Sequence, residues 1–386
     1  MTMKLIKYSI LALAALSLAF SCKDKKADGE SAPEVPIHYY ASPFQYDIVS
    51  VAEPAADAEV RNVILMIGDG MGLEQVSCAW VVNHGKLNFD NMSVLGLSRT
   101  WSASDLITDS GAGGTALAAG VKTANDHVGS DPDGGPLYSF LVDAGKAGMK
   151  TGVVTTCHLA DATPADFCSH NVYRYNFDDI IADYLDCGVD YIAGGGRDYF
   201  TTKREDSRNI EDEMAAKGYH VVHDEAGLKG ASLPVLGLMS GDNLPVAMER
   251  GDLFRHMVSE GLAKISADGN RFAMMIEGSC IDDWLHGNDI GKAMEELLDF
   301  DRTLGDVLEW AAADGHTLVV VTADHATGCL TLRDGSLEEG RIGVSFASES
   351  HNGIAVPYYV WGPGRDRFGG IMENNELGKL IASFIK

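Results

Sequence analysis

The apolar segment Phe272–Ile276 is followed by a group of side chains that could bind a metal ion. The segment has the length and composition of a buried strand, so Glu277 is predicted to lie where a strand ends and a loop begins. Asp282 and His286 follow four residues apart, and they share one face if this part of the chain is helical. A carboxylate and an imidazole side by side are typical ligands of a borderline divalent cation such as zinc.

The segment Thr317–Val321 repeats this arrangement. It is a second apolar segment of strand length, and it ends in Thr322-Ala-Asp324-His325. Two strand ends that each supply Asp and His predict a metal centre at the carboxyl edge of a parallel sheet. That edge is where open α/β sheets bind their ligands.

Asp69 is a further candidate ligand. It follows the apolar segment Asn62–Ile67 in a turn with glycines on both sides, which lets the backbone bring the carboxylate close to an ion. By itself, an Asp in a glycine turn is more often structural.

Ser110 is predicted to lie at the start of a helix over residues 110–120. Unpaired backbone N–H groups and the positive end of the helix dipole favour a phosphate at such a position. From position alone, the more common role of this serine is an N-cap. A metal ion beside the Ser110 hydroxyl would help remove its proton and make it a nucleophile.

Three further segments carry candidate site residues. Asp161 and Thr163, followed by a proline, offer a carboxylate and a hydroxyl to a hard cation such as magnesium, with helix capping as the alternative role. Arg174 could hold phosphate oxygens bidentately, although isolated arginines usually lie on the surface. His351 lies in a polar loop, where a histidine is normally exposed, but a nitrogen-rich zinc site needs one more imidazole.

Strand-like and helix-like segments alternate along most of the chain. Strands are predicted at residues 62–67, 94–98, 151–155, 191–193, 272–276, 317–321 and 358–361, and helices at 73–83, 110–120, 137–148, 178–186, 253–267, 291–313 and 375–385. This pattern predicts an α/β fold with a doubly wound, mostly parallel central sheet and helices on both faces. The segment 201–243, rich in charge and glycine, is predicted to be an insertion or a peripheral lobe.

The composition is that of a globular protein with a strongly acidic surface. The 386 residues are 46% hydrophobic and 22% charged, with a formal net charge of −26. The chain has no basic stripe that could neutralise phosphates, which argues against nucleic acid as a partner. Small phosphorylated substrates remain compatible, because metal ions can reverse the local field. Solubility is the more common cause of such a charge.

Residues 1–21 resemble a lipoprotein-type signal peptide of bacteria. Lys4 and Lys7 precede an apolar stretch that ends before Cys22, which becomes the lipidated amino terminus in such proteins. A plain secretory leader is the alternative, and a transmembrane helix is disfavoured because the apolar stretch is short. Residues 22–44 are predicted to form a flexible tether, and 45–386 the catalytic domain. The chain is therefore expected to be exported, either to the periplasm or to the outer membrane as a lipoprotein.

Taken together, these segments resemble the alkaline phosphatase family from about Asn62 to the carboxyl end. The motifs that carry the resemblance are Gly68-Asp-Gly-Met-Gly72, Thr108-Asp-Ser110, Gly120-Val-Lys-Thr123, Asp161-Ala-Thr-Pro164, Glu277-Gly-Ser-Cys-Ile-Asp282 with His286, Thr322-Ala-Asp-His325 and His351-Asn-Gly353. One such motif would be a weak signal, whereas seven in the same order are very specific.

The resemblance implies a role for each candidate residue. Ser110 would accept the phosphoryl group as a phosphoserine, Arg174 would clamp the non-bridging oxygens, and Asp109 would orient Arg174. The implied metal ligands are Asp282, His286 and His351 for a first zinc, Asp69, Asp324 and His325 for a second zinc, and Asp161, Thr163 and Glu277 for one magnesium, toward which Asp69 bridges. Two successive in-line displacements would then release inorganic phosphate from a monoester.

Two features depart from the family pattern. Asp283 stands where relatives often have lysine, histidine or tryptophan, so it should change how phosphate is held through water and favour magnesium nearby. Only 25 residues separate His325 from His351, so the crown-like insertion of many relatives is predicted to be short or missing. A homodimer is left open, because an argument from that lobe is weak.

Two alternatives to a phosphomonoesterase are considered. A phosphodiesterase or sulfatase of the same superfamily commonly uses threonine, or a modified cysteine or serine, as nucleophile. The combination of Ser110, Arg174 and Glu277 favours monoesters instead. A non-catalytic phosphate- or metal-binding surface lipoprotein is the second alternative, and it would have no use for an activated serine.

Overall fold

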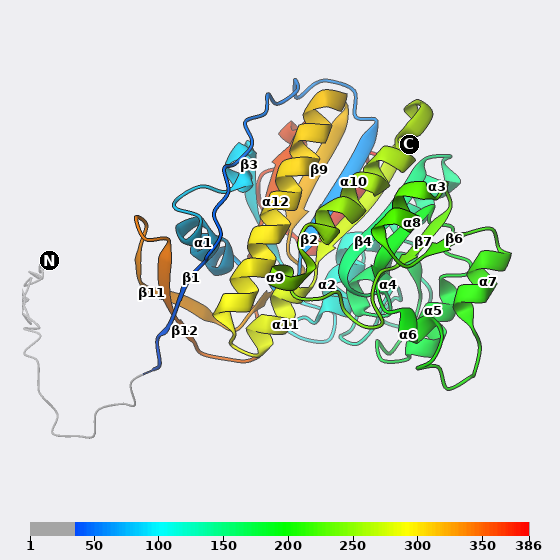
Figure 1. The fold of residues 1–386 in the computed structure, drawn as a ribbon, viewed down its shortest axis with the longest axis horizontal. Coiled ribbons are helices and arrows are strands. Elements are labelled where there is room, and N and C mark those ends of the chain that lie inside the picture. The colour runs from blue at the N-terminus through cyan, green and yellow to red at the C-terminus, as the bar shows by residue number, and fades with distance from the viewer. Residues whose placement is uncertain (1–34, 386) are drawn as a thin grey trace, which may run out of the picture. The chain divides into compact units, whose positions relative to one another are not determined.

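A ten-stranded sheet forms the centre of the protein, whose computed structural model describes residues 35–385 (Figure 1). The predicted signal peptide and most of the predicted tether lie outside the described residues. In spatial order the strands are β15 (Gly370–Glu373), β3 (Val94–Arg99), β14 (Val356–Trp361), β9 (Thr317–Thr322), β2 (Asn62–Gly68), β8 (Phe272–Gly278), β4 (Lys150–His158), β5 (Tyr191–Gly195), β7 (Val235–Leu238) and β6 (His220–Val222). Within this sheet, β14 alone runs antiparallel to its neighbours.

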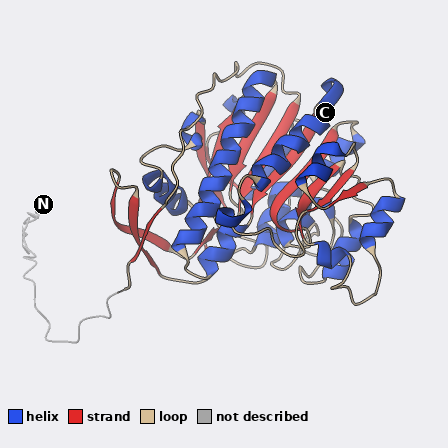
Figure 2. Cartoon of the chain, viewed as in Figure 1, coloured by secondary structure: helices blue, strands red, loops and turns tan. Residues whose placement is uncertain are grey.

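Helices cover both faces of the sheet, as the alternation of strands and helices predicted (Figure 2). They are α1 (Leu73–Val82), α2 (Ser110–Ala119), α3 (Phe140–Lys146), α4 (Ala162–Cys168), α5 (Phe177–Asp183), α6 (Arg197–Phe200), α7 (Ile210–Ala216), α8 (Glu225–Gly230), α9 (Ala247–Arg250), α10 (Leu253–Ile265), α11 (Cys280–His286), α12 (Ile290–Asp314) and α13 (Asn374–Ala382). Short 3₁₀ turns lie at Asn88–Asn91, Ala267–Gly269 and Arg365–Arg367. Among residues 35–385, no helix is long and apolar enough to cross a lipid bilayer.

The two faces of the sheet have separate hydrophobic cores, because side chains alternate along each strand. In β2, Ile64 and Met66 belong to the core under α1, α10 and α12, and α10 and α12 lie across the near face of the sheet in Figure 1. Val63, Leu65 and Ile67 belong to the opposite core, with α2, α3, α4 and α13. A strand that is buried on both faces must be apolar throughout, which explains the unbroken apolar run of β2.

Two smaller sheets complete the fold. One is a three-stranded antiparallel sheet of β1 (His38–Ala41), β12 (Arg341–Phe346) and β11 (Leu330–Ser336). The other pairs β10 (Ala326–Thr327) with β13 (His351–Asn352). The connection between His325 and His351 therefore consists of β10, the β11–β12 hairpin and short loops, consistent with a reduced crown.

Three predictions about the elements need correction. The segment 201–243 is no separate lobe, because β7 pairs with β5 and β6 pairs with β7 inside the central sheet. These strands have only four and three residues, too few to show a periodic pattern. The tether prediction is wrong for β1, since His38 pairs with Val344 of β12. The helix predicted at 137–148 is shorter, because Ser139 caps it and it begins at Phe140.

The contact between α2 and α4 yields a test of how α2 is held in place. A Cβ atom added at Gly114 would lie 2.0 Å from Asp166 Oδ2, a buried carboxylate whose other oxygen accepts a 2.7 Å hydrogen bond from Thr115 Oγ1. We expect Gly114→Ala to lower the free energy of unfolding by about 1–3 kcal/mol through overpacking. Urea denaturation followed by circular dichroism measures this change.

Gly145→Ala in α3 is the matched control. A Cβ atom at Gly145 meets nothing within 4 Å, so this variant should be up to about 1 kcal/mol more stable through helix propensity. Equal stability of the two variants would contradict tight packing of α2 on α4.

Candidate active site

Four neighbouring parallel strands deliver candidate residues to one edge of the sheet. They are β9, β2, β8 and β4, adjacent in that order. Ile67 of β2 is in register with Thr322 of β9 and with Glu277 of β8, so the segments that follow these strands begin at the same level. This register brings the predicted residues together at the carboxyl edge of the parallel sheet, where such folds bind their ligands.

The turn after β2 brings Asp69 into the site. Gly70 adopts a φ of 70°, and its backbone N–H donates to Asp324 Oδ1 over 3.3 Å. A Cβ atom at Gly70 would lie 2.7 Å from Asp282 Oδ1. Both the left-handed conformation and the close approach therefore require glycine after Asp69.

Ser110 is the first residue of α2, and Asp109 rather than Ser110 caps the helix. Asp109 Oδ1 accepts from the backbone N–H of Ala112 over 3.0 Å. The Ser110 hydroxyl thus has no capping bond to make, and its Oγ lies 3.2 Å from Nε2 of His325. The N-cap alternative for Ser110 is therefore wrong, and its buried hydroxyl points at an imidazole of the predicted metal centre.

Asp69, Asp324 and His325 form the first cluster of ligand atoms, as predicted. One ligand atom from each lies within 4.8 Å of the others, and all three residues are buried. His325 Nε2 is 3.2 Å from Asp324 Oδ2 and 3.5 Å from Asp69 Oδ1. The same nitrogen lies 3.2 Å from Ser110 Oγ, so a cation bound here would lie beside the hydroxyl.

Asp282, His286 and His351 form the second cluster. His286 Nε2 lies 3.0 Å from Asp282 Oδ2, which confirms that this pair shares one face of α11. His351 Nε2 lies 3.1 Å from His286 Nε2 and 3.8 Å from Asp282 Oδ2. The β10–β13 ladder positions His351, because it pairs His351 with Thr327 just beyond His325. The His351 and His325 rings stack with 3.5 Å between centroids, so the two clusters adjoin.

Glu277, Asp161 and Thr163 have less direct contact with one another. Glu277 is fully buried and accepts a 2.6 Å hydrogen bond from Thr155 Oγ1 at Oε2. Its other oxygen, like Thr163 Oγ1, is buried with no hydrogen-bond partner among the described residues. Asp161 caps α4 at Ala162 and pairs with Arg174, so it has both the capping role and a role in the site.

Arg174 lies against Asp109 and Asp161. Its two terminal nitrogens are 3.2 Å from Asp109 Oδ2 and 3.0 Å from Asp161 Oδ1. Asp109 directly precedes Ser110, so the guanidinium is held close to the start of α2. Burial would lower the pKa of Arg174, but Asp161 and Asp109 raise it above its usual value, so the side chain remains charged.

The carboxylates of the site are crowded and mostly disfavoured as anions. Burial, reinforced by Asp324 and Asp282, raises the pKa of Asp69 well above its usual value. Burial raises the pKa of Glu277 to about 8 and that of Asp324 to about 6. Burial also lowers the pKa of His325, so its imidazole is neutral and available as a ligand.

Two carboxylates of the site are exceptions. Burial acts to raise the pKa of Asp161, but His158 and Arg174 bring it below the usual value. Asp282 is the second exception. Burial acts to raise its pKa, but hydrogen bonds from His286 and His351 bring it well below the usual value. The hydrogen bond to Asp282 in turn raises the pKa of His286 to about 9.

The donor set fits bound cations. Asp69 Oδ1, Asp324 Oδ2 and Glu277 Oε1 are buried without a hydrogen-bond partner among the described residues, which is costly unless a cation approaches them. Neutral imidazole beside carboxylate suits zinc, and the oxygen-only group around Glu277 and Thr163 suits magnesium.

Sequence reasoning missed three supporting residues. Thr327 donates a short hydrogen bond from Oγ1 to Asp282 Oδ1, and it also lies 3.3 Å from His325 Nδ1. Thr155 holds Glu277, and Asn243 Nδ2 donates to Asp283 Oδ2 over 2.9 Å. Thr327 lies only two residues after His325, which was the one local signal available. Asn243 accepts from the backbone N–H of His158, at the end of β4, over 2.9 Å, a contact that no local pattern in the sequence indicates.

Comparisons with known proteins identify relatives of this chain. The family model described as Alkaline phosphatase matches residues 60–342. Alkaline phosphatase 4 of Bacillus subtilis (strain 168) is 30% identical over 415 residues, covering 85% of this chain and 89% of the relative. The solved structure of alkaline phosphatase from the Antarctic bacterium TAB5 is 32% identical with a TM-score of 0.81, covering 85% of this chain and 99% of that one. A variant of the TAB5 enzyme, also 32% identical (TM-score 0.79, 87% of this chain and 99% of that one), was solved with Mg bound in a site called M3. The chain therefore belongs to the alkaline phosphatase family, and it is a metal-dependent enzyme that hydrolyses phosphomonoesters.

Proposed function

We propose that this enzyme transfers the phosphoryl group of a monoester to Ser110 and then to water, at a centre that holds two zinc ions and one magnesium ion. The observation that carries the proposal is the 3.2 Å separation between Ser110 Oγ and His325 Nε2, inside a buried cluster of carboxylates and imidazoles. Among the described residues, this hydroxyl makes no helix-capping bond, and its hydrogen-bond contact is with His325 Nε2.

The proposed zinc ligands are the residues of the two clusters described above. Asp282, His286 and His351 would hold the first zinc, Asp69, Asp324 and His325 the second zinc, and Asp161, Thr163 and Glu277 the magnesium. When bound, such ions supply positive charge that stabilises the entering and departing oxygens of phosphoryl transfer. Asp161 would share its carboxylate between the ion and Arg174, which lies 3.0 Å from its Oδ1.

The residues of the chain then act in two displacements. Ser110 Oγ forms a bond to phosphorus as the bond to the leaving oxygen breaks, and the alcohol departs with a proton. A water molecule next attacks the phosphoserine, which releases inorganic phosphate and restores the Ser110 hydroxyl. Arg174 would bind the non-bridging oxygens in both steps, while Asp109 and Asp161 fix the position of its guanidinium.

Hydrolysis of three chromogenic substrates tests this function. We expect the 4-nitrophenyl phosphomonoester to be cleaved at alkaline pH, at least about 100-fold faster than the matching diester or sulfate ester, and a chelator to stop the reaction. Preference for the diester or the sulfate would instead favour the other activities of the superfamily. No hydrolysis of any ester by the metal-loaded protein would favour a binding protein.

Arg174→Lys separates charge from bidentate geometry. Lysine keeps the positive charge but presents a single ammonium group, so we expect kcat/KM for monoesters to fall by roughly 10- to 100-fold, the range of one or two charged hydrogen bonds. Inhibition by inorganic phosphate should weaken in parallel. Arg208→Lys, at an exposed ion pair with Glu213, is the control and should change neither value. Unchanged phosphate inhibition in Arg174→Lys would exclude the proposed clamp.

The raised carboxylate pKa values predict that metal binding releases protons. At pH 7 the metal-free protein keeps a proton on Glu277, whose pKa is about 8. Metal ligation requires the anion, so zinc and magnesium should displace about one proton or more at pH 7 and few above pH 9. Calorimetric titration in buffers of different ionisation enthalpy measures this number. The same proton release at pH 7 and pH 9 would contradict the assignment.

We also propose that the chain is exported and anchored through Cys22, with small phosphorylated molecules rather than nucleic acid as substrates. The leader-like residues 1–21 and the net charge of −26 support this. Membrane fractionation of cells that express Cys22→Ala tests the anchor, because this variant should move to the soluble fraction while keeping phosphatase activity.

A further inference from the structure

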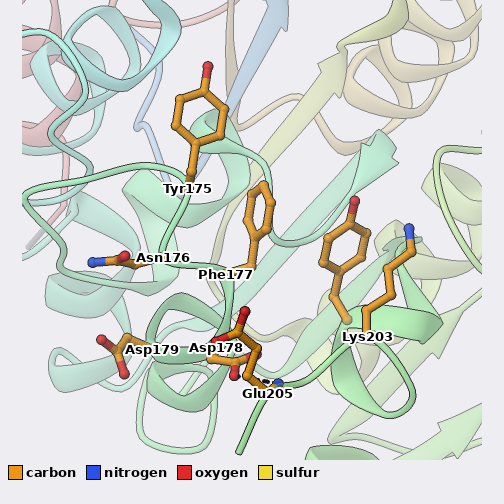
Figure 3. Close-up of a pocket in the computed structure, with 8 residues that line it drawn as sticks. Tyr175, Asn176, Phe177, Asp178, Asp179, Lys203 and Glu205 are labelled. Carbon is orange, nitrogen blue, oxygen red and sulfur yellow. Dashed lines mark hydrogen bonds between the residues drawn. The ribbon is translucent and has the colours of Figure 1, made fainter.

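An aromatic pocket opens directly beside Arg174. The cavity has a volume of about 580 Å³, and we call it the aromatic pocket. Its lining residues are Tyr175, Asn176, Phe177, Asp178, Asp179, Tyr199, Lys203 and Glu205. In Figure 3 the side chains of Tyr175, Phe177 and Lys203 extend toward the same side of the view. None of the lining residues has a role in the two displacements described above.

The rings of the pocket form one connected wall. The Tyr175 and Phe177 ring centroids are 6.1 Å apart, and those of Phe177 and Tyr199 are 5.1 Å apart. Tyr199 also stacks on His158 with 4.4 Å between centroids. Lys203 Nζ lies 4.2 Å from the same Tyr199 centroid, so the Tyr175 ring, which is 55% exposed, is the part of the wall most open to a further planar ring.

The wall begins one residue from the proposed phosphate clamp. Arg174 Cζ lies 5.7 Å from the centroid of the Tyr175 ring. On its other side, the same guanidinium contacts Asp109, which directly precedes Ser110. A phosphate bound to Arg174 would therefore lie close to the Tyr175 ring.

Packing does not explain the exposed rings. Tyr175 is 55% exposed and Tyr173, which contacts it at 5.3 Å between centroids, is 47% exposed. Phe177, by contrast, packs against the core under α5. Single exposed aromatic residues are common, but adjoining exposed rings at the rim of a polar site are typical of a ligand surface.

The charges at the pocket restrict what it can bind. Asp178, Asp179 and Glu205 are acidic, whereas the one lining cation, Lys203, lies 2.7 Å from Asp242 outside the pocket. A leaving group with further phosphates would be repelled here. A neutral or cationic ring would not be.

We propose that the aromatic pocket binds a planar, uncharged aromatic ring of the leaving group, so that the enzyme prefers phosphomonoesters whose leaving group carries such a ring over those without one. The aromatic group can be a phenol or the base of a nucleoside monophosphate. This preference rests on the proposed function, since it places the phosphate of the same substrate at Ser110 and Arg174.

The experiment compares kcat/KM for phenyl phosphate, adenosine 5′-monophosphate and glycerol 2-phosphate in Tyr175→Leu, Tyr199→Leu and the unaltered enzyme. The kcat/KM of each aromatic substrate is divided by that of glycerol 2-phosphate. This ratio in each variant is then compared with the ratio in the unaltered enzyme, so intrinsic leaving-group reactivity cancels. We expect the aromatic-to-alkyl ratio to fall about 10-fold, within the range measured for stacking on one aromatic side chain. Tyr39→Leu, an exposed tyrosine on β1, is the matched control and should keep the ratio.

The outcomes distinguish the ligand sources. A fall for phenyl phosphate alone indicates phenolic esters, and a fall for adenosine 5′-monophosphate alone indicates nucleotides. Ratios that stay unchanged for both substrates in both variants overturn the pocket proposal, while the unaltered enzyme still hydrolyses monoesters. Because Tyr199 also stacks on His158, circular dichroism checks that variant, and Tyr175→Leu carries the test if it misfolds.

A second readout is independent of turnover. Adenosine and phenol carry no phosphate, and we expect ligand-observed NMR to show that both bind the metal-loaded enzyme. Their affinity for Tyr175→Leu should be about 10-fold lower. If the enzyme hydrolyses none of the three esters, the proposed function fails, and this binding experiment still decides the pocket. Absence of binding by both compounds would then overturn it.

Discussion

Replacing Ser110 with alanine is expected to lower kcat for phosphomonoesters by about 10⁴-fold or more, the scale at which enzymes lose activity with their nucleophile. The physical reason is that no other hydroxyl is placed 3.2 Å from His325 Nε2 within the described residues. Metal binding and stability should change little, because Asp109 caps α2 and the ligand atoms come from other side chains. Steady-state kinetics, elemental analysis and thermal melting measure the three quantities.

Ser139→Ala is the matched control for Ser110→Ala. Ser139 caps α3 by accepting from the backbone N–H of Val142, and it donates to the carbonyl of Phe167 over 2.9 Å. Its replacement should lower the free energy of unfolding by about 1 kcal/mol and leave kcat within a factor of about two. Near-normal turnover by Ser110→Ala, with metals still bound, would contradict the proposed nucleophile.

Removing the metal ions is expected to abolish hydrolysis and to destabilise the fold. Five carboxylates meet at the sheet edge, namely Asp69, Asp161, Glu277, Asp282 and Asp324, and they repel one another without cations. At a free metal concentration 100-fold above Kd, each site adds about 2.7 kcal/mol to stability, which chelation would remove. Thermal melting and activity before and after dialysis against a chelator measure both effects, and added zinc and magnesium should restore them.

The stability of the metal-free protein should depend on pH because these carboxylates are buried close together. The folded pKa of Glu277 is about 8, well above the usual value of 4.5 expected in the unfolded chain, and that of Asp324 is about 6. Between the unfolded and the folded pKa of each carboxyl, the folded state binds more protons than the unfolded state. Stability is therefore greatest below the unfolded pKa and falls as pH rises through the folded pKa. The metal-free protein should therefore melt at a lower temperature at pH 9 than at pH 6.

The metal-loaded protein should lose less stability over the same interval, because protons no longer compete for the ligands at high pH. A metal-free protein that melts at the same temperature as the loaded protein, at both pH values, would contradict the link between the cluster and the fold.

Much of the site was predictable because its parts are local in sequence. The apolar strands β2, β8 and β9 are recognisable by composition, and Asp69, Glu277 and Asp324 follow or end them within two residues. Asp282 and His286 share a face through helical spacing alone, and this prediction is confirmed at 3.0 Å. Short elements were less predictable, as β6 and β7 have too few residues to show a period and were taken for a lobe.

The chemical groups at the ends of the central strands could be recognised in the sequence, because a strand, its following turn and a helical face depend on neighbouring residues. Which of these groups meet depends on the folding of the whole chain. Ser110 and His325 are 215 positions apart, and the β10–β13 ladder, whose strands are two residues long, places His351. Such contacts depend on how two cores and ten strands pack together, and no local sequence pattern predicts that packing. The aromatic pocket has the same origin, since Tyr175 and Tyr199 come from separate loops and helices that only the folded chain brings together.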